Sequence, residues 1–305
     1  MSFATQLAEA VRRTRSVTCV GLDPRKANLP APIRDGVVDD QPHLWATAYL
    51  QFCTEIIDAV ADLVPCVKPQ AAFFEQLGTS GMITLDCVVK YARQKGLLVI
   101  LDGKRNDIGS TATAYADAYL GPESVWGADA LTVSPYLGRD SIEPFVDVCD
   151  ARAAGIFVLV KTSNPGGGLL QNRETDGQSV FGTVAELVRE LNDTRKDGHG
   201  YGPVGSVVGA TYPEELAQMR AAMPNSWILV PGFGAQGGGA ADVMAAFDAS
   251  GLGAVVNSSR HIIFAHSRPE FADQYGDRRW QDAVRAATIE MNQALDVVPS
   301  TPAGS

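Results

Sequence analysis

The most constraining feature of this sequence is a regular alternation of short apolar runs with segments of helical periodicity. Eight runs are rich in β-branched residues and are bounded by loop-forming residues. Nearly continuous hydrophobicity of this kind is typical of strands that are covered on both faces of a parallel sheet. The expected strands are Val17–Asp23, Val64–Pro69, Leu97–Asp102, Ala130–Ser134, Ile156–Thr162, Val204–Gly209, Trp227–Pro231 and Ala254–Ser258.

Segments of helical period occupy the intervals between these runs. Eight strands that alternate with eight helices predict an α/β fold, namely a (β/α)8 TIM barrel with Phe3–Arg15 as an extra N-terminal helix. An open doubly wound sheet is the alternative architecture. We expect residues 1–300 to form a single domain and residues 301–305 to be a frayed tail. The expected helices are Leu44–Ala61, Met82–Gln94, Thr111–Leu120, Ser141–Arg152, Val180–Arg195, Pro213–Ala222, Gly239–Ser250 and Arg278–Leu295.

Composition narrows the classes of function. The 305 residues are 46% hydrophobic and carry a net charge of −10, so we expect a globular protein without a basic patch for nucleic acid. No apolar stretch reaches the roughly 18 residues of a membrane span, and Met1–Arg15 does not resemble a signal peptide. The five cysteines form no C-x-x-C pair, which favours reduced thiols and a cytoplasmic protein.

Polar residues follow the apolar strands at the same end. In a barrel these positions converge on one mouth, where barrel enzymes place their chemistry. A charge at the end of a buried strand costs free energy unless it is paired or functional. The residues concerned are Asp23, Lys68, Asp102 with Lys104, Ser134, Lys161 with Ser163, and Arg260.

The densest charged cluster is residues 101–108, Leu-Asp-Gly-Lys-Arg-Asn-Asp-Ile. In an extended chain Asp102 and Lys104 point to the same side, and Asp107 follows beyond the strand. Lys68 on the neighbouring strand could complete an alternating array, in which the carboxylates keep each lysine protonated. The structural alternatives are a simple ion pair at a strand end, an N-cap role for Asp107, and snorkelling lysines at Lys68 and Lys161.

A second candidate site is the glycine-rich segment 230–239 after the seventh strand. Glycines let a backbone approach a ligand, and a following helix N-terminus favours phosphate. Arg260 after the eighth strand could clamp the same group, because loops seven and eight form the usual phosphate site of such barrels. A flexible turn is the alternative. Two further loops, Arg25–Gln41 and Asn164–Gly177, follow the first and fifth strands.

At these residues the sequence resembles the orotidine 5'-monophosphate decarboxylase family, and in particular its longer bacterial branch (type 2). Residues 101–111, LDGKRNDIGST, match the family's D-x-K-x-x-D-I-x-x-T signature at every fixed position. The segments 20–24, 67–75, 162–166 and 231–238 also fit, in family order. The signature is specific, whereas the glycine loop alone would not be.

The resemblance implies decarboxylation of orotidine 5'-monophosphate (OMP) to UMP and CO2 in pyrimidine biosynthesis, with neither cofactor nor metal. It makes Lys104 the proton donor to pyrimidine C6 and places Asp102 against the departing carboxylate. Lys68 and Asp107 would complete the charged network. The resemblance also implies a homodimer, in which Asp107 and Thr111 serve the partner's site.

The resemblance further implies a set of substrate-binding residues. Asp23 would bind the ribose hydroxyls and Ser163 would contact the pyrimidine ring. The amides near Gly234, together with Gln236 and Arg260, would hold the phosphate. The loops 25–41 and 164–177 are longer than in the shorter branches of the family, so the resemblance does not extend to their lid contacts.

Three other functions are compatible with parts of the pattern. A Schiff-base aldolase would use Lys161 or Lys68 as a nucleophile, but it needs a lysine with a lowered pKa, and the neighbouring carboxylates act in the opposite direction. A keto-sugar-phosphate decarboxylase could share the barrel and the D-x-K core, but it would need Mg²⁺. A non-catalytic phosphate-binding barrel is the third alternative.

Overall fold

The computed structural model describes residues 1–37, 41–210, 213–233 and 239–299. Its centre is a closed barrel of eight parallel strands in the order β1-β10-β9-β8-β5-β4-β3-β2. The predicted barrel is therefore confirmed and the open doubly wound sheet is wrong. The strands are β1 (Thr18–Leu22), β2 (Cys66–Pro69), β3 (Leu98–Arg105), β4 (Ala130–Val133), β5 (Gly155–Lys161), β8 (Val204–Val208), β9 (Ile228–Val230) and β10 (Ala254–Ser258).

Each of the eight predicted apolar runs overlaps one of these strands, although β3 extends three residues beyond the predicted end at Asp102 and β5 begins at Gly155, one residue before its predicted start. Six of the strands are buried along their whole length, as expected where helices cover the outside of the barrel and side chains fill the inside. The longer helices are α1 (Phe3–Thr14), α3 (Pro42–Val60), α5 (Gly78–Gln94), α6 (Gly109–Tyr119), α7 (Glu143–Arg152), α9 (Val180–Asn192), α10 (Pro213–Ala222) and α14 (Trp280–Ala294).

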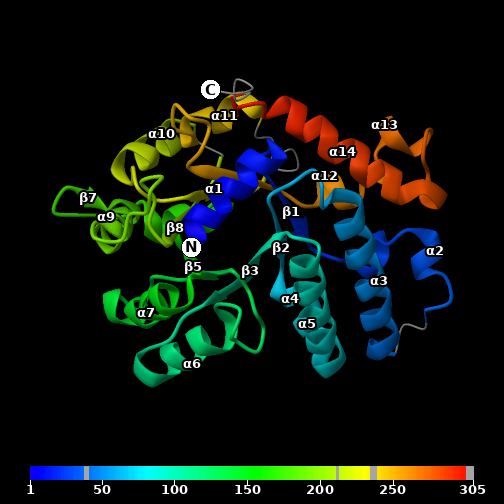
Figure 1. Ribbon diagram of the computed structural model, residues 1–305, viewed down its shortest axis with the longest axis horizontal. Coiled ribbons are helices and arrows are strands. Elements are labelled where there is room, and N and C mark those ends of the chain that lie inside the picture. Colours follow the sequence, from blue (N-terminus) through cyan, green and yellow to red (C-terminus); the bar gives the residue numbers. More distant parts are fainter. Residues whose placement is uncertain (38–40, 211–212, 234–238, 300–305) are drawn as a thin grey trace.

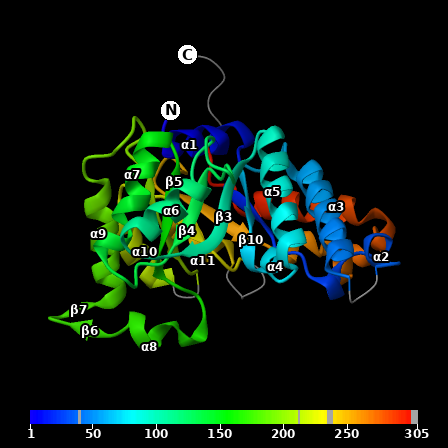
Figure 2. The ribbon, with the colours of Figure 1, turned by 90° about the horizontal axis from the view of Figure 1, so that it is seen from below.

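The extra helix α1 covers the amino ends of the barrel strands. Its first residue, Phe3, is buried and contacts the Phe157 ring edge-to-face at a centroid distance of 6.0 Å. Gly155, which begins β5, leaves room for this ring, because a Cβ there would lie 2.2 Å from Phe3. Figure 2 shows α1 and the amino terminus at one end of the molecule, with α8 (Gly168–Gln171) and a small hairpin at the opposite end. The carboxyl end of the barrel is therefore left for the loops after the strands.

The structure differs from the sequence prediction in the segments between strands. The helix expected over Gly239–Ser250 is only one turn, α11 (Ala240–Val243), followed by a 3-10 turn over Met244–Ala246. The segment expected to be a loop after β5 contains α8 and the hairpin of β6 (Glu174–Thr175) and β7 (Gln178–Ser179). These short elements cannot be predicted from hydrophobic periodicity, because a single turn contains less than one hydrophobic repeat. Their glycine and polar residues also resemble those of a loop. The other short helices are α2 (Ala31–Arg34), α4 (Ala71–Glu75), α12 (Arg260–Ile263) and α13 (Pro269–Ala272).

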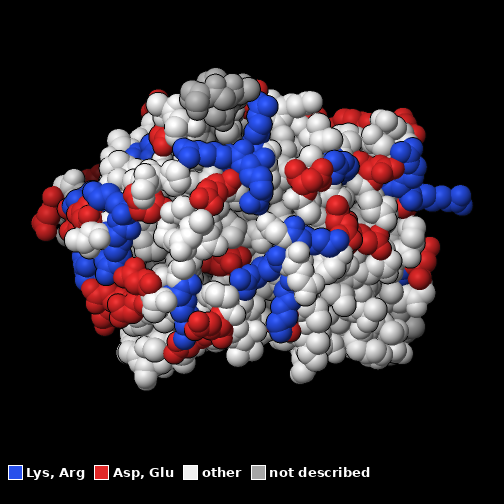
Figure 3. Space-filling model, in the orientation of Figure 1, with Lys and Arg blue, Asp and Glu red and all other residues white. Residues whose placement is uncertain are grey.

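Acidic and basic side chains are intermixed on the molecular face shown in Figure 3. Surface ion pairs of the protein include Arg152 with Asp117 at 2.6 Å and Arg285 with Asp62 at 2.7 Å. Each such exposed pair stabilises the fold by at most about 1 kcal/mol. Among the described helices, none combines the length and the apolar character needed to cross a bilayer.

Candidate active site

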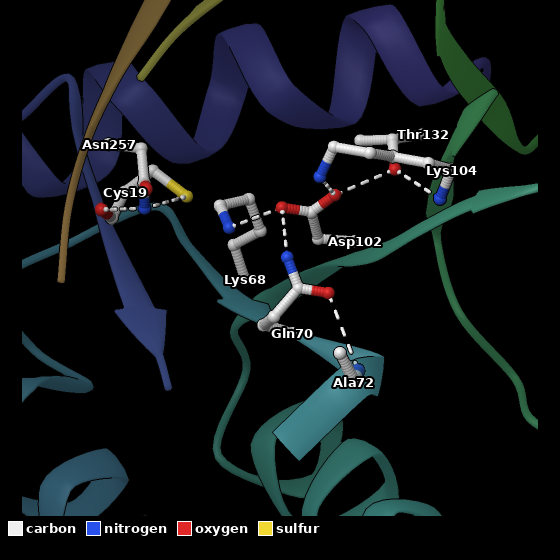
Figure 4. Close-up of polar contacts among 8 residues, drawn as sticks. All are labelled: Cys19, Lys68, Gln70, Ala72, Asp102, Lys104, Thr132 and Asn257. Atoms are coloured by element: carbon white, nitrogen blue, oxygen red, sulfur yellow. Dashed lines mark hydrogen bonds and ion pairs between the residues drawn. The ribbon is translucent and has the colours of Figure 1, made fainter. Parts of the chain in front are cut away.

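The centre of the candidate site is the Asp102 carboxylate on β3, which accepts four hydrogen bonds from three strands and a loop residue (Figure 4). Its Oδ2 accepts from Lys68 Nζ at 2.8 Å and from Gln70 Nε2 at 3.0 Å. Its Oδ1 accepts from Lys104 Nζ at 2.6 Å and from Thr132 Oγ1 at 2.9 Å. Both carboxylate oxygens are therefore fully engaged, which holds the group in one orientation.

Burial and charge determine the protonation of this cluster. Burial alone would lower the pKa of Lys68, but the carboxylates of Asp102 and Asp23 outweigh it and raise that pKa above its usual range. Burial alone would raise the pKa of Asp102, but Lys68 and Lys104 outweigh it and hold that pKa well below its usual range. At neutral pH the cluster is therefore an ionised carboxylate between ammonium groups.

The three charged side chains of the cluster extend from the interior of the barrel toward the open end of the barrel. The Lys68 and Asp102 side chains are 6% and 10% exposed, whereas that of Lys104 is 47% exposed. Lys104 is thus the member of the cluster that a molecule entering from the mouth meets first.

The backbone that carries Lys104 is not the regular extended chain that the sequence predicts. Leu101 pairs with Leu131 and Arg105 with Val133, so β3 contains a bulge opposite β4. Lys104 itself has a φ of 45°, in the left-handed region that non-glycine residues rarely adopt. The Thr132 hydroxyl accepts from the Lys104 amide at 2.9 Å, which supports this conformation. The predicted meeting of Asp102 with Lys104 is correct, but a bulge brings it about instead of strand alternation.

A cavity of about 220 Å³ opens beside the cluster. One wall carries the charged groups of Lys68, Asp102 and Lys104, and Ser163 lies in the loop that borders the cavity. Its apolar lining comes from β5, β8 and β9 and from the proline that directly follows β9. The cavity can therefore hold a planar, partly apolar group against two ammonium ions and a carboxylate. Its other lining residues are Thr132, Leu159, Thr162, Asn164, Val207, Leu229 and Pro231.

Comparison with known proteins assigns this barrel to a family. The model of the orotidine 5'-phosphate decarboxylase / HUMPS family matches residues 16–275. The chain therefore belongs to this family. A protein from Rhodopirellula baltica named orotidine 5'-phosphate decarboxylase is 69% identical over 299 residues, which cover 97% of this chain and 99% of that protein.

More distant relatives agree with this assignment. A protein of the same name from Caldicellulosiruptor bescii is 39% identical and covers 94% of this chain and 99% of its own length. The solved structure of Leishmania donovani OMP decarboxylase is 34% identical and superposes with a TM-score of 0.75. It covers 98% of this chain and 100% of its own.

Two of the residues that the family resemblance assigns to the substrate lie near the charged cluster. Asp23 directly follows β1, and its charge contributes to the raised pKa of Lys68. The Asp23 Oδ1 atom is buried and accepts no hydrogen bond within the described part of the chain, so it is available to a ligand hydroxyl. Ser163 lines the cavity.

Asp107 and Thr111 lie apart from their own chain's cavity. Asp107 accepts a hydrogen bond from the Ile108 amide at 2.8 Å and is not among the described residues that line the cavity. Ile108 is the N-cap of α6, so an N-cap role for Asp107 is wrong. Ile108 is also 56% exposed, and Thr111 is exposed in the first turn of α6. This chain alone therefore does not bring Asp107 into the array.

The predicted phosphate residues are only partly described. Gly234 and Gln236 lie outside the described residues. Arg260 is exposed at the start of α12 and lines a separate hollow of about 350 Å³ together with Arg25 and Arg268. The helix that follows the glycine loop has only four residues, α11, so the full helix N-terminus expected there is absent from the described structure.

Lys161 does not belong to the cavity. Its side chain is buried on the outer side of the barrel wall, near Asn172 and Glu215. It is therefore neither a snorkelling residue at the rim nor a candidate nucleophile for an aldolase in this cavity. For Lys68, the ion pair with Asp102 at 2.8 Å raises the pKa of its ammonium group, which disfavours the nucleophile role.

Sequence reasoning missed two partners of Asp102. Gln70 stands two residues after Lys68, so strand alternation could have placed its side chain on the same face of β2. Thr132 lies on β4, and only the pairing of β3 with β4 brings it to Asp102. Among the described residues, no group of three or more His, Cys, Asp or Glu side chains is placed to hold a metal ion.

Proposed function

We propose that this chain decarboxylates orotidine 5'-monophosphate to UMP and CO2. The single observation that carries the proposal is the Lys68–Asp102–Lys104 array beside a cavity of about 220 Å³, in a member of the orotidine 5'-phosphate decarboxylase / HUMPS family. The reaction requires a fixed cation at the carbon that loses CO2, and Lys104 is the exposed end of this array.

Lys104 acts on pyrimidine C6. When the bond between C6 and the carboxylate breaks, its electron pair stays on C6, and the Lys104 ammonium both stabilises this charge and delivers the proton that forms the new C–H bond. Two unit charges about 4 Å apart interact by roughly 4 kcal/mol at an effective dielectric near 20. Since each 1.36 kcal/mol lowers the barrier by about tenfold in rate, this interaction alone is worth about three orders of magnitude.

Asp102 faces the substrate carboxylate. The repulsion between the two anions disappears as neutral CO2 forms, so the arrangement favours bond cleavage. The four hydrogen bonds to Asp102 keep it from turning away from the substrate. Binding energy from the distant phosphate, held by Arg260 with Gln236 and the amides near Gly234, opposes this repulsion in the bound state. Asp23 holds the ribose hydroxyls and Ser163 the pyrimidine ring.

The functional unit is a homodimer in the cytoplasm, and residues 1–300 form its single catalytic domain. Asp107 and Thr111 reach the partner's cavity, where Asp107 completes the alternating charges beside Lys104. The position of both residues outside their own cavity supports this arrangement, and so does the exposed Ile108 between them.

The proposal is tested with Lys104→Ala. Decarboxylation is measured as the decrease in OMP absorbance, and we expect this activity to be abolished in the variant. The circular dichroism spectrum should be unchanged, because the Lys104 side chain is half exposed. Lys90→Ala on α5 is the matched control, since Lys90 is also exposed and paired with a carboxylate, Asp86, at 2.8 Å. Near-normal turnover by Lys104→Ala would contradict the assignment of the proton donor.

A further inference from the structure

Lys161, the last residue of β5, carries a buried ammonium group that the proposed chemistry does not use. The residue is 4% exposed. Its Nζ lies 3.3 Å from Glu215 Oε2 on α10 and 4.5 Å from the centroid of the Phe181 ring on α9, and it donates a hydrogen bond to Asn172 Oδ1 at the end of α8. A buried ammonium is costly unless it is compensated in this way. Lys161 therefore joins three helices behind the barrel wall.

A second contact fixes the neighbouring residue to the same turn. Gln171 Oε1 accepts from the Thr162 amide at 3.0 Å, and Gln171 Nε2 donates to Thr162 Oγ1 at 2.7 Å. The adjacent side chains of Gln171 and Asn172 thus bind the adjacent residues Thr162 and Lys161. The segment from 161 to 172 is thereby closed into a loop by its own ends.

Within this loop, Ser163 packs closely against Gly209, which directly follows β8. The Gly209 amide donates to the Lys161 carbonyl at 2.8 Å. A Cβ at Gly209 would lie 2.9 Å from Ser163 Cβ and 3.0 Å from Ser163 N, so only glycine allows the two segments to approach this closely. Ser163 also lines the cavity beside the charged cluster.

We propose that Lys161 is a positioning residue for the decarboxylation: its buried ammonium holds the closed 161–172 loop so that Ser163 is presented to the pyrimidine ring. Lys161 does not touch the substrate and acts only through Ser163. The inference rests on the proposed function, because it assigns Ser163 to the ring of that substrate. A small misplacement of a contact residue is enough to matter, since an error of about 1 Å can cost on the order of 100-fold in rate.

A double-mutant cycle distinguishes positioning from a merely structural role. Lys161→Met keeps the length of the side chain and removes its charge, and Ser163→Ala removes the contact to the ring. We expect Lys161→Met to lower kcat/KM for OMP by about tenfold or more, and to lower it by less than about twofold when Ser163 is already alanine, because two residues that act through one contact are not additive. Additive losses would overturn the proposal.

Further variants keep the test decisive if Lys161→Met does not fold. Gln171 and Asn172 are the partly exposed side of the clamp, by which we mean the contacts of Gln171 with Thr162 and of Asn172 with Lys161. Gln171→Ala and Asn172→Ala should therefore show the same non-additivity with Ser163→Ala. Lys196→Met, which removes an exposed lysine, is the matched control and should leave kcat/KM unchanged. Clamp variants that behave like this control would overturn the inference.

Proteolysis gives a readout that does not depend on turnover. Arg173 is exposed directly after the clamp, so trypsin should cut there faster in Asn172→Ala than in the unmodified protein. Equal rates of cutting would contradict the clamp. An unmodified protein that fails to decarboxylate OMP would instead overturn the proposed function, even if the cutting rates differ as expected.

Discussion

Replacing Asp102 with asparagine tests how strongly the charged cluster depends on its centre. Oδ2 accepts from Lys68 and Gln70, and Oδ1 accepts from Lys104 and Thr132. An asparagine presents one oxygen and one NH2 group, so whichever way it turns, its nitrogen faces two donors. The substitution removes the counter-charge of Lys68 and two of the four hydrogen bonds together.

The magnitude follows from the geometry. Two unit charges 2.8 Å apart attract by about 6 kcal/mol at an effective dielectric of 20, and desolvation offsets part of this attraction. Breaking a buried pair by removing one partner typically costs about 3–5 kcal/mol, and Lys104 adds little because its side chain is half exposed. Since native proteins are stable by about 5–15 kcal/mol, Asp102→Asn should fold but with much reduced stability.

The assay is urea unfolding followed by circular dichroism at neutral pH. Asp117→Asn is the control, because it breaks the exposed ion pair with Arg152 and should cost less than about 1 kcal/mol. Adding Lys68→Met to Asp102→Asn should recover part of the loss, since the orphaned ammonium is then gone. If Asp102→Asn were no less stable than Asp117→Asn, the argument from the buried pair would be refuted.

The buried Lys68–Asp102 pair also predicts that the free energy of unfolding depends on pH. The pKa of Asp102 is depressed in the folded state, so its contribution to stability is present above the unfolded-state pKa of about 3.9 and is lost as the pH falls below that value. The difference in unfolding free energy between the unmodified protein and Asp102→Asn should therefore be largest at neutral pH and should narrow in acid. A difference that stays constant between pH 7 and pH 3 would contradict this sign.

Two further predictions concern the phosphate and the partner subunit. Arg260→Ala should weaken UMP binding, measured by calorimetry, far more than it weakens the binding of uridine, which lacks the phosphate; equal losses would argue against a phosphate contact. Mixing the inactive variants Lys104→Ala and Asp107→Ala should restore part of the activity, because a mixed dimer contains one site with both native residues, and no recovery after subunit exchange would contradict the shared site.

The amino-acid sequence by itself determined the class of fold and indicated the central residues of the candidate site. Strands covered on both faces must be apolar along their length, and helices that cover them must be apolar on one stripe, so local composition shows the eight-fold alternation without any tertiary information. Asp102, Lys104 and Lys68 could be predicted because charged residues at the ends of apolar strands are costly unless they are used.

Only the tertiary structure decided which groups meet. The bulge in β3 sets the direction of Lys104, and the pairing with β4 brings Thr132 to both Asp102 and the Lys104 amide. The sequence also did not distinguish Lys161 from Lys68: both end apolar strands, yet one faces α10 and the other the cavity. Periodicity depends on residues a few positions apart, whereas the face on which a strand-end side chain lies depends on bulges and on partners that only closure of the barrel brings together.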